Sequence, residues 1–362
     1  MNIKYSATSL FLFFSLSAQA NAQSIGHEEL LVLSKRAQTL AIVDPSDLKV
    51  IARVSVGNDP HEVIASADGK TAYVSNYGFG AFNTLTPVDL VRQTALPPID
   101  LGALRGPHGL TFAGGKVWFT AEAAKAIGSY DPQGNKVDWI LGTGQNRTHM
   151  IFVSADLQWI ATTNVSSATV SLMEKSRNQR PAGPPPPMAN SGGGTPQQGG
   201  PPMGGGPRGA PGGDWDETLI PVGHGSEGFD LSPDGSEIWV ANAQDGTISI
   251  ISKEKKTVIQ TLAANVKGAN RLKFTPDGKM VLISSLGGSG LTIYDAATRK
   301  EIKRLNIGRG AAGIVMQPDG SRAFVACTPD DYVAVIDLKS LEVVGHIDAG
   351  PEPDGLAWSI RR

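Results

Sequence analysis

The stretch GFDLSPDGSEIWVANAQDGTISIISKEKKTVIQTLA, residues 228–263, decides the fold of this chain. It holds four apolar segments of strand length, and the Pro-Asp-Gly and Asp-Gly sequences between them are typical of tight turns. The same order returns at residues 313–348, and a similar order with an Ala-Asp-Gly turn begins at residue 61. Each repeat therefore predicts a sheet of four antiparallel strands. Segments such as SIIS and VAVID are apolar on both faces, as expected for strands packed between neighbouring sheets.

One position recurs just before the first strand of every repeat, after a Gly-rich or turn-forming sequence. Successive members are 47, 41, 78, 43, 42 and 42 residues apart, so the period is about 42 residues with one interruption. Such a period, built from short strands and turns, predicts a β-propeller. The seven positions, which we expect to form a ring around the central axis, are His61, His108, His149, Glu227, Asn270, Ala312 and Asp354.

The two ends of the chain predict how the ring closes. The chain begins with EELLVLS, TLAIVD and VIARVSV, which are three strands without a first one, and it ends with PDGLAWS, a first strand without the rest. Paired together, they complete one blade and remove the exposed sheet edges that invite aggregation. The sequence thus predicts an all-β, seven-bladed propeller with four antiparallel strands in each blade.

Composition excludes several classes of function. The chain has 362 residues, 18% of them charged, and a formal net charge of -2. Its lysines and arginines are scattered, whereas a nucleic-acid surface needs them clustered on one face, so we do not expect nucleic-acid binding. We expect a monomer. The one cysteine, Cys327, has no partner for an internal disulfide, and a small buried role is favoured for it.

The first 22 residues have the pattern of an export signal. Lys4 precedes the apolar run LFLFFSLSA, and small residues at Ala20 and Ala22 fit a cleavage site before Gln23. The run is too short to span a bilayer, and no later segment reaches that length. We therefore expect a cleaved signal peptide and a protein that is periplasmic or secreted.

Residues 178–213 interrupt the fourth repeat. This Pro- and Gly-rich stretch has almost no side chains that bury apolar surface, so it predicts a disordered insert. It falls between the third and fourth strands, which places it on the face opposite the polar ring. A tolerated loop is favoured over a tether or a partner-docking segment.

The repeats resemble a known family. AYVSN at 72–76 and IWVAN at 238–242, together with the PDG turns and the VID or YD strands that follow, are similar to the YVTN-repeat family of YncE-like or lactonase-like seven-bladed propellers. The third and sixth repeats depart from this pattern, with WFTAE and LISSL. The resemblance implies the fold, but the family includes binding proteins, lactonases and redox-associated proteins, so it does not fix the function.

The polar ring is the predicted functional site. Converging imidazoles and a carboxylate suit a divalent transition metal such as Zn, Mn, Fe or Cu better than Ca. The predicted metal ligands are His61, His108, His149 and Glu227. The alternative is a water-filled channel lined by polar residues, which propellers commonly have.

Further polar residues end the second strands, about fifteen residues after the ring positions. Because neighbouring strands are antiparallel, Asn76 and Asn164 are expected beside His61 and His149, and Glu122 is expected to hold the second nitrogen of His108. With Asn270 on the ring, these residues form the predicted ligand- or cofactor-binding set. The alternative is that they satisfy backbone groups of the adjoining loops.

Three functions remain open from the sequence. The first is a binding protein whose axial mouth holds a small polar ligand, a metal or a partner protein. The second, implied by the lactonase-like resemblance, is a metal-dependent hydrolase or lyase, with Glu227 or Asp354 as the base of the hydrolase. The third is a structural module tethered through the Pro- and Gly-rich insert.

Overall fold

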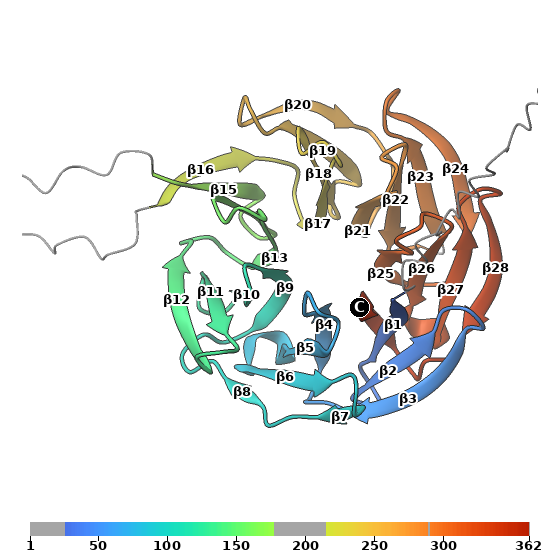
Figure 1. Cartoon of the computed structure of the whole chain (residues 1–362). Helices are drawn as coiled ribbons and strands as arrows, with labels where there is room; N and C mark the ends of the chain where they lie inside the picture. The colour runs from blue at the N-terminus through green and yellow to red at the C-terminus, as the bar shows by residue number, and fades with distance from the viewer. Residues whose placement is uncertain (1–25, 177–214, 289, 362) are drawn as a thin grey trace, which may run out of the picture.

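The computed structural model describes residues 26–176, 215–288 and 290–361. Their strands form seven sheets arranged around one axis, which confirms the predicted seven-bladed propeller (Figure 1). The predicted signal peptide, 1–22, and the predicted insert, 178–213, lie outside the described residues.

The strands of each blade are antiparallel, and they are given below in order from the axis outward. Blade one has β29 (Pro353–Arg361), β1 (His27–Ser34), β2 (Thr39–Asp44) and β3 (Lys49–Ser55). Blade two has β4 (Pro60–Ala65), β5 (Thr71–Asn76), β6 (Thr84–Asp89) and an outer edge of two short pieces, β7 (Thr94–Ala95) and β8 (Ile99–Asp100). Blade three has β9 (Pro107–Ala113), β10 (Lys116–Ala121), β11 (Ala126–Asp131) and β12 (Lys136–Gly142).

The remaining four blades follow the same order. Blade four has β13 (Thr148–Val153), β14 (Trp159–Asn164), β15 (Thr169–Lys175) and β16 (Trp215–Pro221). Blade five has β17 (Ser226–Leu231), β18 (Glu237–Asn242), β19 (Thr247–Ser252) and β20 (Thr257–Leu262). Blade six has β21 (Ala269–Phe274), β22 (Met280–Ser285), β23 (Gly290–Asp295) and β24 (Lys300–Asn306). Blade seven has β25 (Ala311–Met316), β26 (Arg322–Cys327), β27 (Tyr332–Asp337) and β28 (Glu342–Ile347). Two short 3-10 turns, η1 (Gly78–Gly80) and η2 (Thr328–Asp330), follow the second strands of blades two and seven.

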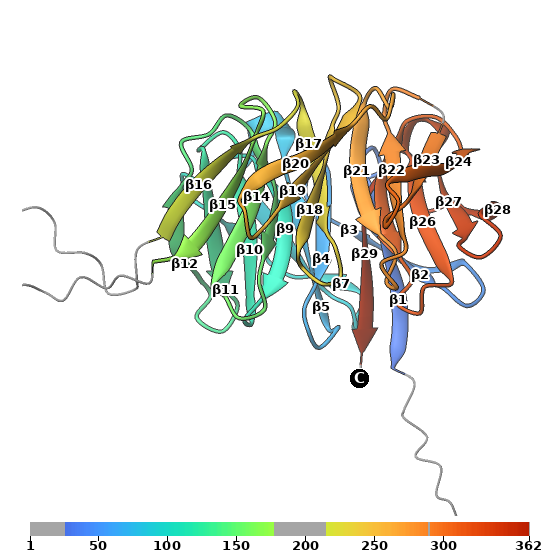
Figure 2. The ribbon, with the colours of Figure 1, turned by 90° about the horizontal axis from the view of Figure 1, so that it is seen from above.

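The ring closes by pairing the two ends of the chain, as predicted. β1 is antiparallel to β29, with His27 opposite Arg361 and Val32 opposite Leu356. The Arg361 guanidinium lies 2.7 Å from the buried carboxylate of Glu29. The free ends of β1 and β29 lie together at one face of the disc (Figure 2).

Burial follows the position of a strand within its blade. The middle strands are buried on both faces, as in β18, because they pack between two neighbouring blades. The outer strands alternate between exposed and half-buried residues, as in β3 and β12, because solvent covers one face. Seven apolar clusters fill the spaces around the ring, and the one between blades five and six includes the fully buried Trp239.

The Asp-Gly turns set the first hairpin of most blades. Gly235 and Gly320 have φ of 69° and 74°, which glycine adopts without a Cβ clash. Asp234 accepts hydrogen bonds from the Ser236 amide and from the Ser232 hydroxyl. These bonds fix the register of the two inner strands, and with it the place where each ring residue enters the axis. Within the described residues, no helix is long and apolar enough to cross a membrane.

Candidate metal and ligand site at the axial mouth

All seven predicted ring positions are the second residue of an innermost strand, so they lie at one level around the axis. The residue two places earlier has a positive φ in every blade, between 48° and 73°, and this bend turns the chain into the axis. Four blades use glycine at this step and three use a charged residue: Asp59, Gly106, Arg147, Gly225, Gly268, Gly310 and Glu352.

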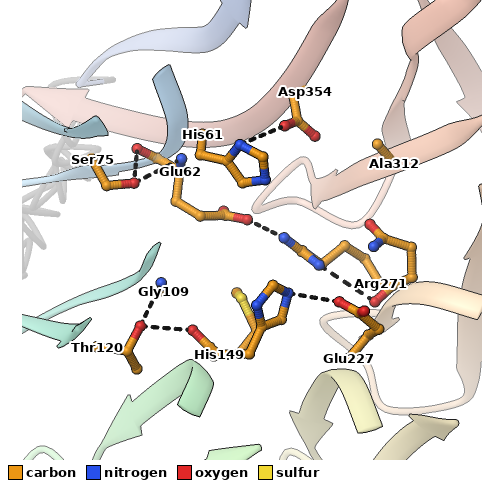
Figure 3. A network of polar contacts seen from close by, with 12 residues as sticks. His61, Glu62, Ser75, Gly109, Thr120, His149, Glu227, Arg271, Ala312 and Asp354 are labelled. Carbon is orange, nitrogen blue, oxygen red and sulfur yellow. Dashed lines mark hydrogen bonds and ion pairs between the residues drawn. The ribbon is translucent and has the colours of Figure 1, made fainter. Parts of the chain in front are cut away.

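The three histidine rings lie next to one another in a row. The ring centroids of His61 and His108 are 4.5 Å apart, and those of His108 and His149 are 3.8 Å apart. At the other end of this row, His61 Nδ1 lies 3.6 Å from a carboxylate oxygen of Asp354 (Figure 3).

His108 is fully buried, and neither of its ring nitrogens has a hydrogen-bond partner among the described residues. Burial and the neighbouring positive groups, His149 first among them, hold its pKa well below the usual range for histidine. His108 is therefore neutral and keeps a lone pair that no protein group uses. Leaving a buried polar group without a partner costs about 1–3 kcal/mol.

His149 lies between two carboxylates. Its Nδ1 is 2.5 Å from Glu122 Oε1. Its Nε2 is 2.7 Å from Glu227 Oε2 (Figure 3). Burial opposes a charge on this ring, but Glu227 and Glu122 outweigh burial and raise the pKa of His149. Burial would likewise raise the pKa of Glu227, but His149 and Arg147 lower it to about 2.

Glu122 occupies a different place from the one that its spacing suggested. β10 ends at Ala121, which pairs with Pro107, so Ala121 takes the place that Asn76 has opposite Pro60. Glu122 is the next residue and corresponds to Tyr77, whose hydroxyl donates a hydrogen bond to it. The expected contact with His108 is thus replaced by a hydrogen bond to His149 of the next blade, because the turn after β10 carries the carboxylate past its own blade.

His108, Glu122 and His149 together could hold a metal ion. One possible ligand atom from each lies within 4.8 Å of the others, and all three side chains are buried. Two imidazole nitrogens and one carboxylate oxygen suit a transition metal better than the oxygen-only shells of Ca²⁺. His61, which was also predicted as a ligand, lies next to His108 and has a buried Nδ1 without a hydrogen-bond partner.

Asn76 and Asn164 do not reach the histidines. The Asn76 amide donates to the hydroxyls of Thr84 and Thr86. The Asn164 amide donates to two hydroxyls of β15, at Thr169 and Ser171. Both asparagines therefore tie their second strand to the third, which replaces the expected orienting contacts with His61 and His149. Asn270 does lie on the ring, where it is 7% exposed.

Hydroxyl groups on the second strands fix the backbone of the ring. Thr120 accepts a hydrogen bond from the Gly109 amide and donates one, 2.8 Å long, to the carbonyl of His149 in the next blade (Figure 3). Thr163 and Ser284 make the same bond, 2.7 Å long, to the ring residues of blades five and seven. The position of each ring side chain thus depends on the blade before it.

An ion pair crosses the axis next to the ring, and its members are residues that the sequence did not single out. Arg271 of β21 reaches Glu62 of β4, on a blade three steps away around the ring (Figure 3). Arg271 and Glu62 each directly follow a ring residue, and four other blades have glycine at this position. A Cβ there would lie within 2.5 Å of the carbonyl oxygen of the ring residue in the next blade, as for Gly109, Gly228, Gly313 and Gly355. These glycines let the inner strands approach closely, so one arginine spans the narrowed channel.

The mouth has an excess of negative charge among the described residues. Lys35 lies 3.4 Å from Asp354 and 3.7 Å from Asp59, and Arg147 lies 3.2 Å from Glu227. Three groups of ion pairs around the mouth contain five carboxylates against three permanently charged cations: Asp59, Glu62, Glu122, Glu227 and Asp354 against Lys35, Arg147 and Arg271. A bound cation would balance this charge.

Comparison with known proteins supports the fold and leaves the activity open. A family model described as the cytochrome D1 heme domain matches residues 214–321. This stretch contains one histidine, His224, whose side chain is 74% exposed and pairs with Asp245. An exposed, acid-paired histidine does not fit as the ligand of an enclosed haem iron, so we assign no haem site to it.

Several solved structures are similar. A "putative 6-phosphogluconolactonase" of Bacteroides uniformis has a TM-score of 0.69 at 14% identity, over 92% of this chain and 99% of that one. A protein of the same description from Bacteroides fragilis has a TM-score of 0.67 at 15% identity, over 93% and 99%. Hydrazine synthase of Kuenenia stuttgartiensis has a TM-score of 0.65 at 16% identity, over 87% and 93%. No curated protein matches the chain by sequence. At these identities the likeness is one of fold alone.

Proposed function

We propose that the chain is an exported propeller that binds a divalent transition metal at its axial mouth and uses the loaded mouth to bind a small polar ligand. The observation that carries this proposal is His108, a fully buried and neutral imidazole with two unpartnered nitrogens beside His149 and Glu122. A metal ion supplies the partner that the protein does not. Export rests on the signal-like sequence of residues 1–22.

The ligand set follows from which possible ligand atoms lie close together. His108, His149 and Glu122 are the first ligands, and His61 is a candidate for a fourth, because its buried Nδ1 also lacks a hydrogen-bond partner. Glu227 faces the other nitrogen of His149, so we assign it to orient that ring. Carboxylates commonly hold metal-bound histidines in this way. Zn, Mn, Fe or Cu fits two or three nitrogens and an oxygen.

Charge supports the same conclusion. The five carboxylates of the mouth exceed its three permanent cations by two. With His149 neutral, which metal ligation requires, a divalent ion brings this buried network to balance. An unbalanced charge in a buried site is costly, so the network favours an added cation.

A lactonase-like hydrolase is the second candidate. The two Bacteroides structures and the His108, Glu122 and His149 cluster favour it. A bound metal would supply a Lewis acid for a carbonyl and lower the pKa of water. Glu227, with a pKa of about 2, is a weak base, so Asp354 beside His61 is the better candidate for that role.

Metal analysis of the full chain tests the proposal. The protein is purified without chelator, incubated with Zn, Mn, Fe or Cu one at a time, and its metal content is measured by mass spectrometry. We expect about one ion per chain for the wild type and almost none for the His108→Ala and His149→Ala double variant. His224→Ala, which changes an exposed histidine, is the control and keeps its metal. A wild type that takes up none of the four metals disproves the proposal.

A lactone panel then separates the two candidates. Hydrolysis that needs the metal and falls sharply in Asp354→Asn supports the hydrolase. Metal binding without hydrolysis of any lactone in the panel leaves the ligand-binding function.

A further inference from the structure

Arg147 stands at the bend that leads each blade into the mouth. Its φ is 57°, at a step where four of the seven blades have glycine. A non-glycine residue is disfavoured in this region of backbone conformation, since its Cβ crowds the following carbonyl. The same bend in blades two and one carries Asp59 and Glu352, so every non-glycine residue at this step is charged. Of the three, Arg147 is the one cation, and it contacts the metal-binding cluster.

The guanidinium of Arg147 is incompletely paired. It lies 3.2 Å from Glu227 Oε1 and 3.7 Å from Glu122 Oε2, and the Tyr77 hydroxyl is also beside it. Both carboxylate distances are longer than the 2.7–2.9 Å of a strong charge-assisted hydrogen bond. Both carboxylates already serve other groups, because His149 contacts both and Tyr77 donates to Glu122. The Arg147 side chain is 41% exposed, whereas these two acidic partners are 6% and 13% exposed. Most of its five N–H donors therefore remain available to a ligand that enters the mouth.

Position relative to the cluster limits the size of that ligand. Glu122 contacts His149 through one oxygen and Arg147 through the other. The guanidinium thus lies about one carboxylate width from the His149 ring, with Glu122 between them. A single small molecule can reach both if its anionic group lies one or two bonds from a second oxygen.

We propose that Arg147 is a specificity-determining residue that binds the carboxylate of a small hydroxy- or oxo-acid, whose second oxygen lies at the His108, Glu122 and His149 cluster. This inference rests on the proposed metal-binding function and names the ligand class of the same site. A guanidinium recognises a planar carboxylate through two parallel hydrogen bonds, which a lysine cannot reproduce.

Titration calorimetry with glycolate and its uncharged analogue glycolamide tests the inference on the full, metal-loaded chain. We expect the wild type to bind glycolate more tightly than glycolamide. Arg147→Ala should weaken glycolate binding about 10- to 100-fold and leave glycolamide unchanged. Arg147→Lys should recover part of the loss. The matched control is Arg309→Ala, which removes an exposed arginine paired with Asp330 on the rim of blade seven, and it should bind glycolate like the wild type.

The inference is overturned if Arg147→Ala binds glycolate within about twofold of the wild type, if the wild type does not prefer glycolate, or if it binds no glycolate. The metal content of each sample is measured in parallel. A metal-free wild type contradicts the proposed function, whereas metal-loaded Arg147→Ala with undiminished glycolate binding contradicts only the role of Arg147.

Discussion

Blades five and seven have the same strand pairing at the end of the second strand, but blade five has a polar residue there and blade seven has a cysteine. In blade five, Asn242 lies opposite Thr247 and donates hydrogen bonds to the hydroxyls of Thr247 and Ser249. In blade seven, Cys327 lies opposite Tyr332, and Ala334 takes the place of the serine. Both second-strand residues are fully buried. Burial at this step is therefore set by the fold, and the amide of Asn242 is stabilised there by hydroxyl groups of the third strand.

The ring shows the same rule on a larger scale. His149 is as buried as Ala312, but carboxylates of blades three and five hold both of its nitrogens. In blade seven the ring residue is alanine, which needs no such partner. The buried imidazole of His149 thus depends on residues of the blades on both of its sides.

Among the substitutions that test this comparison, removal of the Glu227 carboxylate should lower the stability of the protein most. In chelator-treated protein, Glu227→Ala leaves a buried, protonated His149 with one of its two carboxylates, so we expect the free energy of unfolding to fall by about 3–5 kcal/mol. Urea denaturation measures the loss. Glu227→Gln keeps an acceptor for Nε2 and should lose less. A Glu227→Ala variant as stable as the wild type would show that the ion pair does not hold His149.

The second-largest loss of stability is expected when the asparagine of blade five is introduced into blade seven. Cys327→Asn places an amide beside Ala334, where blade five has Ser249, so we expect a loss of about 2–3 kcal/mol. Adding Ala334→Ser restores one hydroxyl partner and should recover about 1 kcal/mol. Urea unfolding of the single and double variants gives both values. A single variant as stable as the wild type would contradict the rule that the third strand must provide the partners.

The sequence predicted the fold because its signals are local. The Asp-Gly turns and the period of about 42 residues are enough to count blades and to align the ring positions, and the two ends pair as their strand order required. The hydrogen-bond partners of the asparagines differ from the expected ones, and the sequence contains a signal for them. Asn164 and Asn242 are each followed five and seven residues later by hydroxyl residues, which indicates a clamp between strands rather than a ligand site.

Other parts of the site depend on contacts between blades that the sequence does not specify. The first hairpin of blade three is two residues shorter than that of blade two, since Ala121 pairs with Pro107 fourteen residues away and Asn76 pairs with Pro60 sixteen residues away. Glu122 therefore lies one residue past the end of the strand pairing, in the turn that faces the next blade. Arg271 and Glu62 are 209 residues apart, and alignment places them at the same step of their repeats. The alignment does not show that the Arg271 side chain crosses the axis. That contact depends on the width of the channel, which the glycines of the other blades make narrow.

Removing the clamp of blade five should have a smaller effect than adding an unpartnered amide to blade seven. Asn242→Ala leaves the hydroxyls of Thr247 and Ser249 without their donor, and we expect a loss of about 1–2 kcal/mol. Chemical denaturation measures it. Ser285→Ala, at the same step of blade six, removes one hydrogen bond to the Lys267 carbonyl and should lose less. A larger loss for Ser285→Ala than for Asn242→Ala would contradict the clamp.

The smallest effect is expected from the thiol of blade seven at high pH. Burial raises the pKa of Cys327 from 9.0 to about 12. Below pH 9 the thiol is neutral in both folded and unfolded chains, so its contribution to stability is fully present. Above pH 9 the unfolded thiol ionises first, and this contribution is lost as the pH rises toward 12. Unfolding free energies at pH 8, 9.5 and 10.5 should therefore fall more steeply for the wild type than for Cys327→Ala. Parallel slopes would show that the thiol reaches solvent in the folded protein, and blade seven would then be open at the step where blade five is sealed.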